Sequence, residues 1–117
     1  MLVKRDFIKL KESNDEHLRV FQWNILCNGL AFNSFDRVPD ELVEWSYREG
    51  LIVQHILDIN ADVVCLQEMD KFTELMAKLG HIYEGHCAMK PDGMMGCSVL
   101  WKKDKIMRVS DFKSVQF

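Results

Sequence analysis

Two apolar segments joined by a long helical segment most constrain how this chain can fold. Residues 18–26 are rich in β-branched and aromatic side chains and carry apolar residues on both faces of a predicted strand. Residues 41–60 place apolar side chains at helical spacing, and residues 62–67 form a second, shorter apolar strand directly afterwards. Two strands connected by a helix of this length are typical of a crossover unit with parallel neighbouring strands. The sequence therefore predicts an α/β fold.

Further elements are predicted on either side of this unit. Residues 28–40 contain Gly, Asn, Ser and Pro and are expected to form a long loop. Asp70 is expected to cap a helix that ends at Gly80, and the Lys-Pro-Asp-Gly string at 90–93 predicts a turn. Strands are also predicted at residues 7–10, 81–89, 97–101 and 106–117.

The composition is that of a folded protein with a small net charge. Hydrophobic residues make up 48% of the 117 positions, and 15 Lys and Arg stand against 18 Asp and Glu, which leaves a net charge of −3. These values exclude a disordered or low-complexity chain. The negative charge argues against nucleic-acid binding through a global electrostatic field, so a polyanion would need a local site. Residues 1–17 are predicted to be a solvated lead-in to a single domain, or part of one, at residues 18–117.

Neither a membrane anchor nor a secretory signal is predicted. No apolar run approaches the roughly 20 residues that a membrane helix needs, and the first residues lack the apolar stretch of a signal peptide. The chain is therefore expected to be cytoplasmic, without a membrane partner.

The cysteines are expected to be free thiols. The four of them include no Cys-x-x-Cys pair, and a reducing compartment disfavours disulfides. Cys65 and Cys97 lie in apolar runs and are expected to be buried. The histidines and cysteines between residues 81 and 97 match no structural zinc pattern. His55, at the edge of the apolar helical stripe, is interpreted as structural.

Two polar side chains occur where buried strands are expected to carry apolar ones. Asn24 lies late in the first strand, and Glu68 follows the second. If the strands are parallel neighbours, both side chains emerge at the sheet edge where open α/β sheets place their sites. A carboxylate oxygen beside an amide oxygen suits Mg²⁺, which takes one or two protein carboxylates and leaves positions for phosphate. The alternative is local, with Glu68 capping the next helix and Asn24 bonded to a loop.

The same two segments carry a family resemblance. Phe-Gln-Trp-Asn-Ile-Leu at residues 21–26, followed by Cys-Leu-Gln-Glu-Met-Asp at 65–70, resembles the paired signatures of the exonuclease–endonuclease–phosphatase superfamily. Within the superfamily, the Gln-Trp-Asn-Ile-Leu string at residues 22–26 resembles nocturnin-like members of the deadenylase-like branch, and Trp45 with Arg48 fits the same branch. The match runs from about residue 18 to residue 108, which is most of the chain.

The resemblance implies a reaction and roles for three residues. Glu68 would be the carboxylate that holds Mg²⁺, with Asn24 beside the metal and the scissile phosphate. Lys90 would contact a phosphate, although it could equally be an exposed turn lysine. The implied enzyme is a Mg²⁺-dependent phosphoester hydrolase that removes the 2′-phosphate of NADP(H) or trims poly(A) RNA from its 3′ end. The net charge of −3 favours the dinucleotide.

The resemblance also implies that part of the family domain is missing. Members carry an Asp-x-Asn string with the catalytic base and a later Ser-Asp-His string, and neither occurs after residue 68. Residues 18–117 are therefore interpreted as the first half of a two-sheet α/β sandwich, a mixed sheet with two flanking helices and one uncovered face. Without the C-terminal half, the chain is expected to be nearly inactive. The alternatives are a non-catalytic or partner-binding fragment, and another branch such as an abasic-site endonuclease or a lipid phosphatase.

Overall fold

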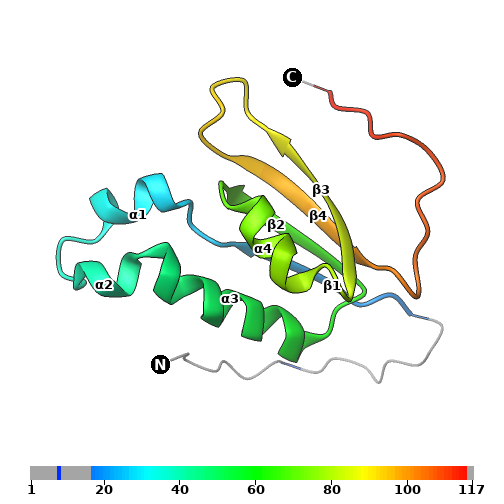
Figure 1. Cartoon of the computed structure of the whole chain (residues 1–117), viewed down its shortest axis with the longest axis horizontal. Helices are drawn as coiled ribbons and strands as arrows, with labels where there is room; N and C mark the ends of the chain where they lie inside the picture. The colour runs from blue at the N-terminus through cyan, green and yellow to red at the C-terminus, as the bar shows by residue number, and fades with distance from the viewer. Residues whose placement is uncertain (1–7, 9–16, 116–117) are drawn as a thin grey trace.

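The computed structural model describes residue 8 and residues 17–115, and its strands form one mixed sheet with helices packed against one face (Figure 1). The strand order in the sheet is β1-β2-β4-β3. The predicted strand at residues 7–10 lies outside the described residues, except for Ile8. The described elements are β1 (Val20–Asn24), α1 (Asn28–Ser34), α2 (Asp40–Val43), α3 (Trp45–Ile59), β2 (Val63–Met69), α4 (Phe72–Leu79), β3 (Tyr83–Met89) and β4 (Gly96–Lys102).

The crossover predicted from the sequence is confirmed. β1 pairs in parallel with β2, with Val20 opposite Val63 and Asn24 opposite Gln67. The connection between these strands contains α3, drawn in green in Figure 1. β4 pairs antiparallel with both β2 and β3. The fold is therefore α/β with a mixed sheet, as the sequence predicts.

The hydrophobic core lies between the sheet and the helices α3 and α4. Ile52 and Ile56 lie one helical turn apart on α3, and both are buried. Leu75 and Leu79 have the same relation on α4. Full burial of a side chain of this size contributes roughly 1.5–3 kcal/mol, so this face is the main source of stability. The strands add alternate residues to the same core: Val64, Leu66 and Leu100.

The opposite face of the sheet is largely open within the described part of the chain. Val20 and Val99, which alternate with core residues, are 63% and 42% exposed. His86 is opposite Val99 in register, and the ring of Phe112 stacks on it with centroids 3.8 Å apart. This face matches the uncovered surface that the sequence predicts.

Several details of the predicted local structure are wrong. Residues 28–40 do not form one long loop, because they contain α1 and the first residue of α2. The helix predicted over residues 41–60 is divided at Glu44, whose φ of −58° and ψ of 142° are extended. Described residues 106–115 form no strand. Both sides of β4 are already paired, with β2 and with β3, so the following residues cannot pair back on it, and Met107 is 82% exposed.

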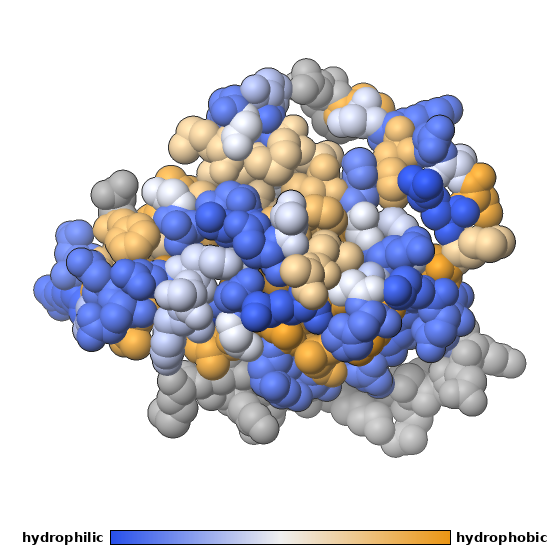
Figure 2. All heavy atoms as spheres, viewed as in Figure 1, coloured by the Kyte–Doolittle hydropathy of each residue, from blue (hydrophilic) through white to orange (hydrophobic). Residues whose placement is uncertain are grey.

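Figure 2 shows where apolar side chains reach the surface on one side of the molecule. They gather around the hairpin formed by β3 and β4, where Met89 and Met94 are exposed. Hydrophilic side chains predominate over α3 and α4 in the same view. Within residues 17–115, no helix is long and apolar enough to cross a membrane.

Candidate functional site

The two polar residues predicted to share a sheet edge lie in direct contact. Asn24 is the last residue of β1, and Glu68 lies at the C-terminal end of the parallel neighbour β2. The Asn24 Nδ2 group donates a hydrogen bond to Glu68 Oε1 at 2.8 Å. The chain after β1 holds both side chains, because Leu26 N–H donates to Asn24 Oδ1 at 3.0 Å and Cys27 N–H donates to Glu68 Oε2 at 3.3 Å.

An irregularity in β2 directs the Glu68 side chain towards β1. Strict alternation would place Glu68 on the face of Val64 and Leu66, which is packed against the helices. The register shifts between Leu66 and Met69, and Glu68 has a φ of 56° in the left-handed region. Such bulges re-aim side chains and occur next to active sites. The left-handed conformation costs a residue with a side chain about 1–2 kcal/mol, so the contact with Asn24 is made on a strained backbone.

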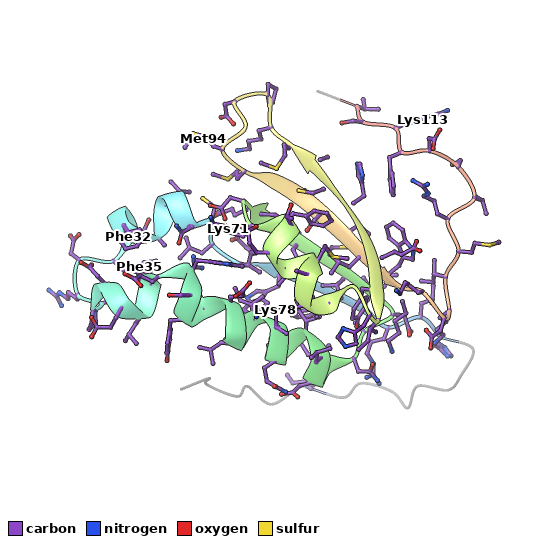
Figure 3. The ribbon with its side chains drawn as sticks, in the orientation of Figure 1. Phe32, Phe35, Lys71, Lys78, Met94 and Lys113 are labelled. Carbon is purple, nitrogen blue, oxygen red and sulfur yellow. The ribbon has the colours of Figure 1, made fainter. Side chains whose placement is uncertain are left out.

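Asp70 has a different role from the predicted one. The N-cap residue of α4 is Lys71, labelled in Figure 3, and no side chain caps this helix. Asp70 Oδ2 instead accepts hydrogen bonds from the N–H groups of Asn28 at 2.7 Å and Gly29 at 3.3 Å, at the start of α1. Asp70 therefore connects the end of β2 to α1. Glu68 does not cap α4 either, since its carboxylate bonds to the end of β1 and the loop after it.

Arg48 of α3 binds the loop after β1 from the inside of the molecule. Its guanidinium donates to the carbonyl oxygens of Val43, Ile25 and Leu26 at 2.8, 2.9 and 2.8 Å. Desolvation lowers the pKa of Arg48, and the nearby Asp70 carboxylate opposes this effect. Arginine stays protonated in proteins, so the loop is held by a charged donor. The sequence marks Arg48 only through its spacing from Trp45.

Comparisons with known proteins place this site in a family. A family model described as the endonuclease/exonuclease/phosphatase family matches residues 21–113, which include Asn24 and Glu68. The chain belongs to this family. Nocturnin of Drosophila melanogaster is 39% identical over an alignment of 104 positions, gaps included, which covers 78% of this chain and 16% of that protein. Human nocturnin is 32% identical over an alignment of 126 positions, gaps included, which covers 92% of this chain and 29% of that protein.

Solved structures of larger proteins share the fold. The structure of ANGEL2, described as a 2′,3′-cyclic phosphatase, matches with a TM-score of 0.72 and 25% identity over 80% of this chain and 29% of that chain. The human nocturnin catalytic domain with bound sulfate matches with a TM-score of 0.55 and 31% identity over 74% of this chain and 33% of that chain. The chain thus spans a third or less of these members of the endonuclease/exonuclease/phosphatase family.

The third predicted site residue, Lys90, lies at the same end of the sheet but apart from the other two. It follows β3 in the hairpin turn, whose tip includes Met94 in Figure 3. Gly96 of β4 pairs with Met69 of β2, so the turn and Glu68 share one edge of the sheet. The Lys90 side chain is exposed, and within the described residues no hydrogen bond or ion pair connects it to the Asn24–Glu68 contact.

The donor set fits a hard cation that binds mainly through water. Glu68 and Asn24 offer carboxylate and amide oxygens, each with a lone pair beyond the hydrogen bonds described above. Among residues 17–115, no group of three or more His, Cys, Asp and Glu side chains is placed to hold a metal ion. Zinc sites usually need at least three such ligands, whereas Mg²⁺ takes one or two carboxylates and keeps several waters. The oxygen donors of Asn24 and Glu68 therefore suit a divalent cation that keeps most of its waters.

His55 packs against aromatic rings, and Cys65 and Cys97 lie on the open side of the sheet. His55 contacts the rings of Phe21 and Trp23 edge-on, with centroids 5.8 and 5.0 Å apart. The expectation that Cys65 and Cys97 are buried is wrong, since Cys65 is half-buried and Cys97 is exposed. Both face the open side of the sheet because strand alternation directs them away from the helices.

Proposed function

We propose that this chain supplies the metal-holding part of the active site of a Mg²⁺-dependent phosphoester hydrolase. The proposal is carried by the 2.8 Å contact between Asn24 Nδ2 and Glu68 Oε1, at the C-terminal edge of two parallel strands. Open α/β sheets bind their ligands at this edge. Membership of the endonuclease/exonuclease/phosphatase family supports the reaction class, since ANGEL2 is described as a phosphatase.

The residues of the site divide the work between binding and orientation. Glu68 would hold Mg²⁺, and Asn24 and the Cys27 N–H group keep the Glu68 carboxylate in one orientation. When bound, Mg²⁺ would neutralise charge on the phosphate oxygens. Lys90 would contact the substrate phosphate from the hairpin turn at the same edge.

The described residues do not complete a hydrolytic site. Hydrolysis also needs a base that deprotonates the attacking water. No second carboxylate within residues 17–115 forms a hydrogen bond with Asn24 or with the Glu68 side chain. We therefore expect the isolated chain to bind Mg²⁺ and to show almost no turnover.

The substrate class we propose is a nucleotide phosphate ester, either the 2′-phosphate of NADP(H) or the 3′ end of poly(A). The net charge of −3 favours the dinucleotide, because a long polyanion is usually held by a basic surface. The chain is similar to nocturnin and to ANGEL2, and for this reason the turnover assays include both classes of nucleotide substrate.

Calorimetric titration of the chain with Mg²⁺ tests the metal site. We expect Glu68→Gln, which keeps the side-chain shape and removes the charge, to weaken Mg²⁺ binding at least tenfold. The matched control is Glu84→Gln, at an exposed position on β3, which should leave the affinity unchanged. Equal Mg²⁺ affinity in Glu68→Gln and the unmodified chain would refute the proposed site.

Turnover assays test the reaction separately from metal binding. NADP⁺, oligo(A) and adenosine 2′,3′-cyclic phosphate should all remain uncleaved by the isolated chain. Mg²⁺-dependent cleavage that Glu68→Gln abolishes would support the hydrolase site and contradict the expected inactivity. The cleaved substrate would then identify the substrate class.

A further inference from the structure

Two consecutive peptide groups after β1 connect Arg48 to both site residues. In the first group, Arg48 Nη1 donates to Ile25 O at 2.9 Å, and Leu26 N–H donates to Asn24 Oδ1 at 3.0 Å. In the second group, the same Nη1 donates to Leu26 O at 2.8 Å, and Cys27 N–H donates to the site glutamate at 3.3 Å. Each peptide is therefore bound by the guanidinium on its carbonyl side and by a site side chain on its amide side.

We infer that Arg48 is a positioning residue for the proposed metal site, acting on Asn24 and Glu68 through these two peptide groups. The inference rests on the proposed function, because it assigns Arg48 a role only towards the residues that would hold the cation. Within the described residues the hydrogen bonds of Arg48 go to backbone carbonyls and not to either side chain.

The backbone at Leu26 shows why these peptides need a partner. In an extended strand, successive carbonyl oxygens point to opposite sides. Here the carbonyls of Ile25 and Leu26 converge on one nitrogen atom, and Leu26 between them has a φ of 61°. This conformation costs about 1–2 kcal/mol for a residue with a side chain, and such strain persists only where the surroundings enforce it. The same turn aims the successive N–H groups of Leu26 and Cys27 at the site.

Arg48 is well suited to enforce this conformation. Its Nε atom donates to Val43 O at 2.8 Å, and its guanidinium carbon lies 5.9 Å from the centroid of the Trp45 ring. The planar guanidinium reaches three carbonyls at once, which a lysine ammonium on a flexible stem does not reproduce. A charged donor also strengthens the N–H bonds on the far side of each peptide, because hydrogen bonds in a chain polarise one another.

The test compares Arg48→Met with a destabilising variant in the core of the same helix. Arg48→Met keeps the apolar stem and removes every donor, whereas Ile56→Val trims the buried core of α3 away from the site. Mg²⁺ affinity is measured by calorimetry well below both unfolding temperatures. We expect Arg48→Met to weaken binding by about 10–100-fold, the usual effect of losing a residue that orients a ligand. Ile56→Val should keep the full affinity, since a purely structural loss does not act on the folded site.

Amide NMR provides a readout that needs no metal. In Arg48→Met, the amide protons of Leu26 and Cys27 should shift and lose protection from hydrogen exchange. Arg48→Lys should restore only part of the protection and of the Mg²⁺ affinity. Ile56→Val should leave both resonances in place.

The outcomes separate the inference from the proposed function. A folded Arg48→Met with unchanged Leu26 and Cys27 resonances, or with unchanged Mg²⁺ affinity, overturns the inference. Arg48→Lys decides the same question if the methionine variant does not fold. Mg²⁺ binding that survives Glu68→Gln instead overturns the proposed metal site, while the amide resonances still decide the positioning of the loop.

Discussion

The left-handed backbone at Glu68 reverses the usual order of stability between glycine and alanine variants. Glu68→Gly and Glu68→Ala both remove the carboxylate, and both lose its hydrogen bonds to Asn24 and Cys27. The two variants therefore differ only in how the backbone tolerates a φ of 56°. Their difference in unfolding free energy measures the strain at this position.

The expected size follows from two opposing terms. A left-handed conformation costs alanine about 1–2 kcal/mol and costs glycine almost nothing. Glycine in a strand is otherwise less stable than alanine by roughly 0.5–1 kcal/mol, because it loses more conformational freedom on folding. The strain term is the larger one, so Glu68→Gly should be more stable than Glu68→Ala by about 0.5–1 kcal/mol.

Urea denaturation of the paired variants measures this difference. The matched control is Gln67, the preceding residue of β2, which is not in the left-handed region. Gln67→Gly should be less stable than Gln67→Ala by about 0.5–1 kcal/mol, the opposite sign. If both positions show the same sign, the backbone at Glu68 is not strained, and the bulge does not explain how its side chain reaches Asn24.

Two further predictions concern stability away from the site. Asp62 accepts hydrogen bonds from Arg19 N–H and from Lys105, and the first of these mainly lowers its pKa. Its stabilisation should be complete above the unfolded pKa of about 4 and lost as pH falls through the lower folded pKa. Urea denaturation should therefore show a stability deficit in Asp62→Asn at pH 6 to 7 that shrinks below about pH 4; a deficit independent of pH would contradict this. In Gly96→Ala, the added Cβ would overlap the backbone carbonyl of Ala88, so the free energy of unfolding should fall by about 1–3 kcal/mol. Gly50→Ala on α3 has open space around the added Cβ, so its free energy of unfolding should rise by up to about 1 kcal/mol in the same assay.

The location of Asn24 and Glu68 at one end of the sheet could be predicted, because it follows from the crossover. Hydrophobic periodicity predicts two strands and a helix between them, and a connection of that length makes the strands parallel. The carboxyl ends of parallel neighbours meet at one edge, so polar residues at both ends must be close. The contact of 2.8 Å agrees with this prediction.

Other parts of the site could not be predicted, because they depend on residues far apart in the sequence. α1 occupies a segment whose Gly, Asn and Ser content favours a loop, and its first N–H groups are bound by Asp70, which lies 41 and 42 residues further along the chain. The strand predicted after residue 105 is absent from the described residues, although the local sequence favours it. Its apolar pattern is present, but β4, the strand it was expected to pair with, already has β2 on one side and β3 on the other.

The sequence by itself determined the parallel crossover and the location of Asn24 and Glu68 at one end of the sheet, since these follow from local periodicity and connection length. Only the tertiary structure decided the left-handed backbone at Glu68 and Leu26, and the contacts of Arg48 with two peptide groups. Both features depend on contacts between segments that lie about 20 to 40 residues apart in the sequence. Such contacts become favourable only after packing has brought the segments together and excluded water from the carbonyl groups they satisfy.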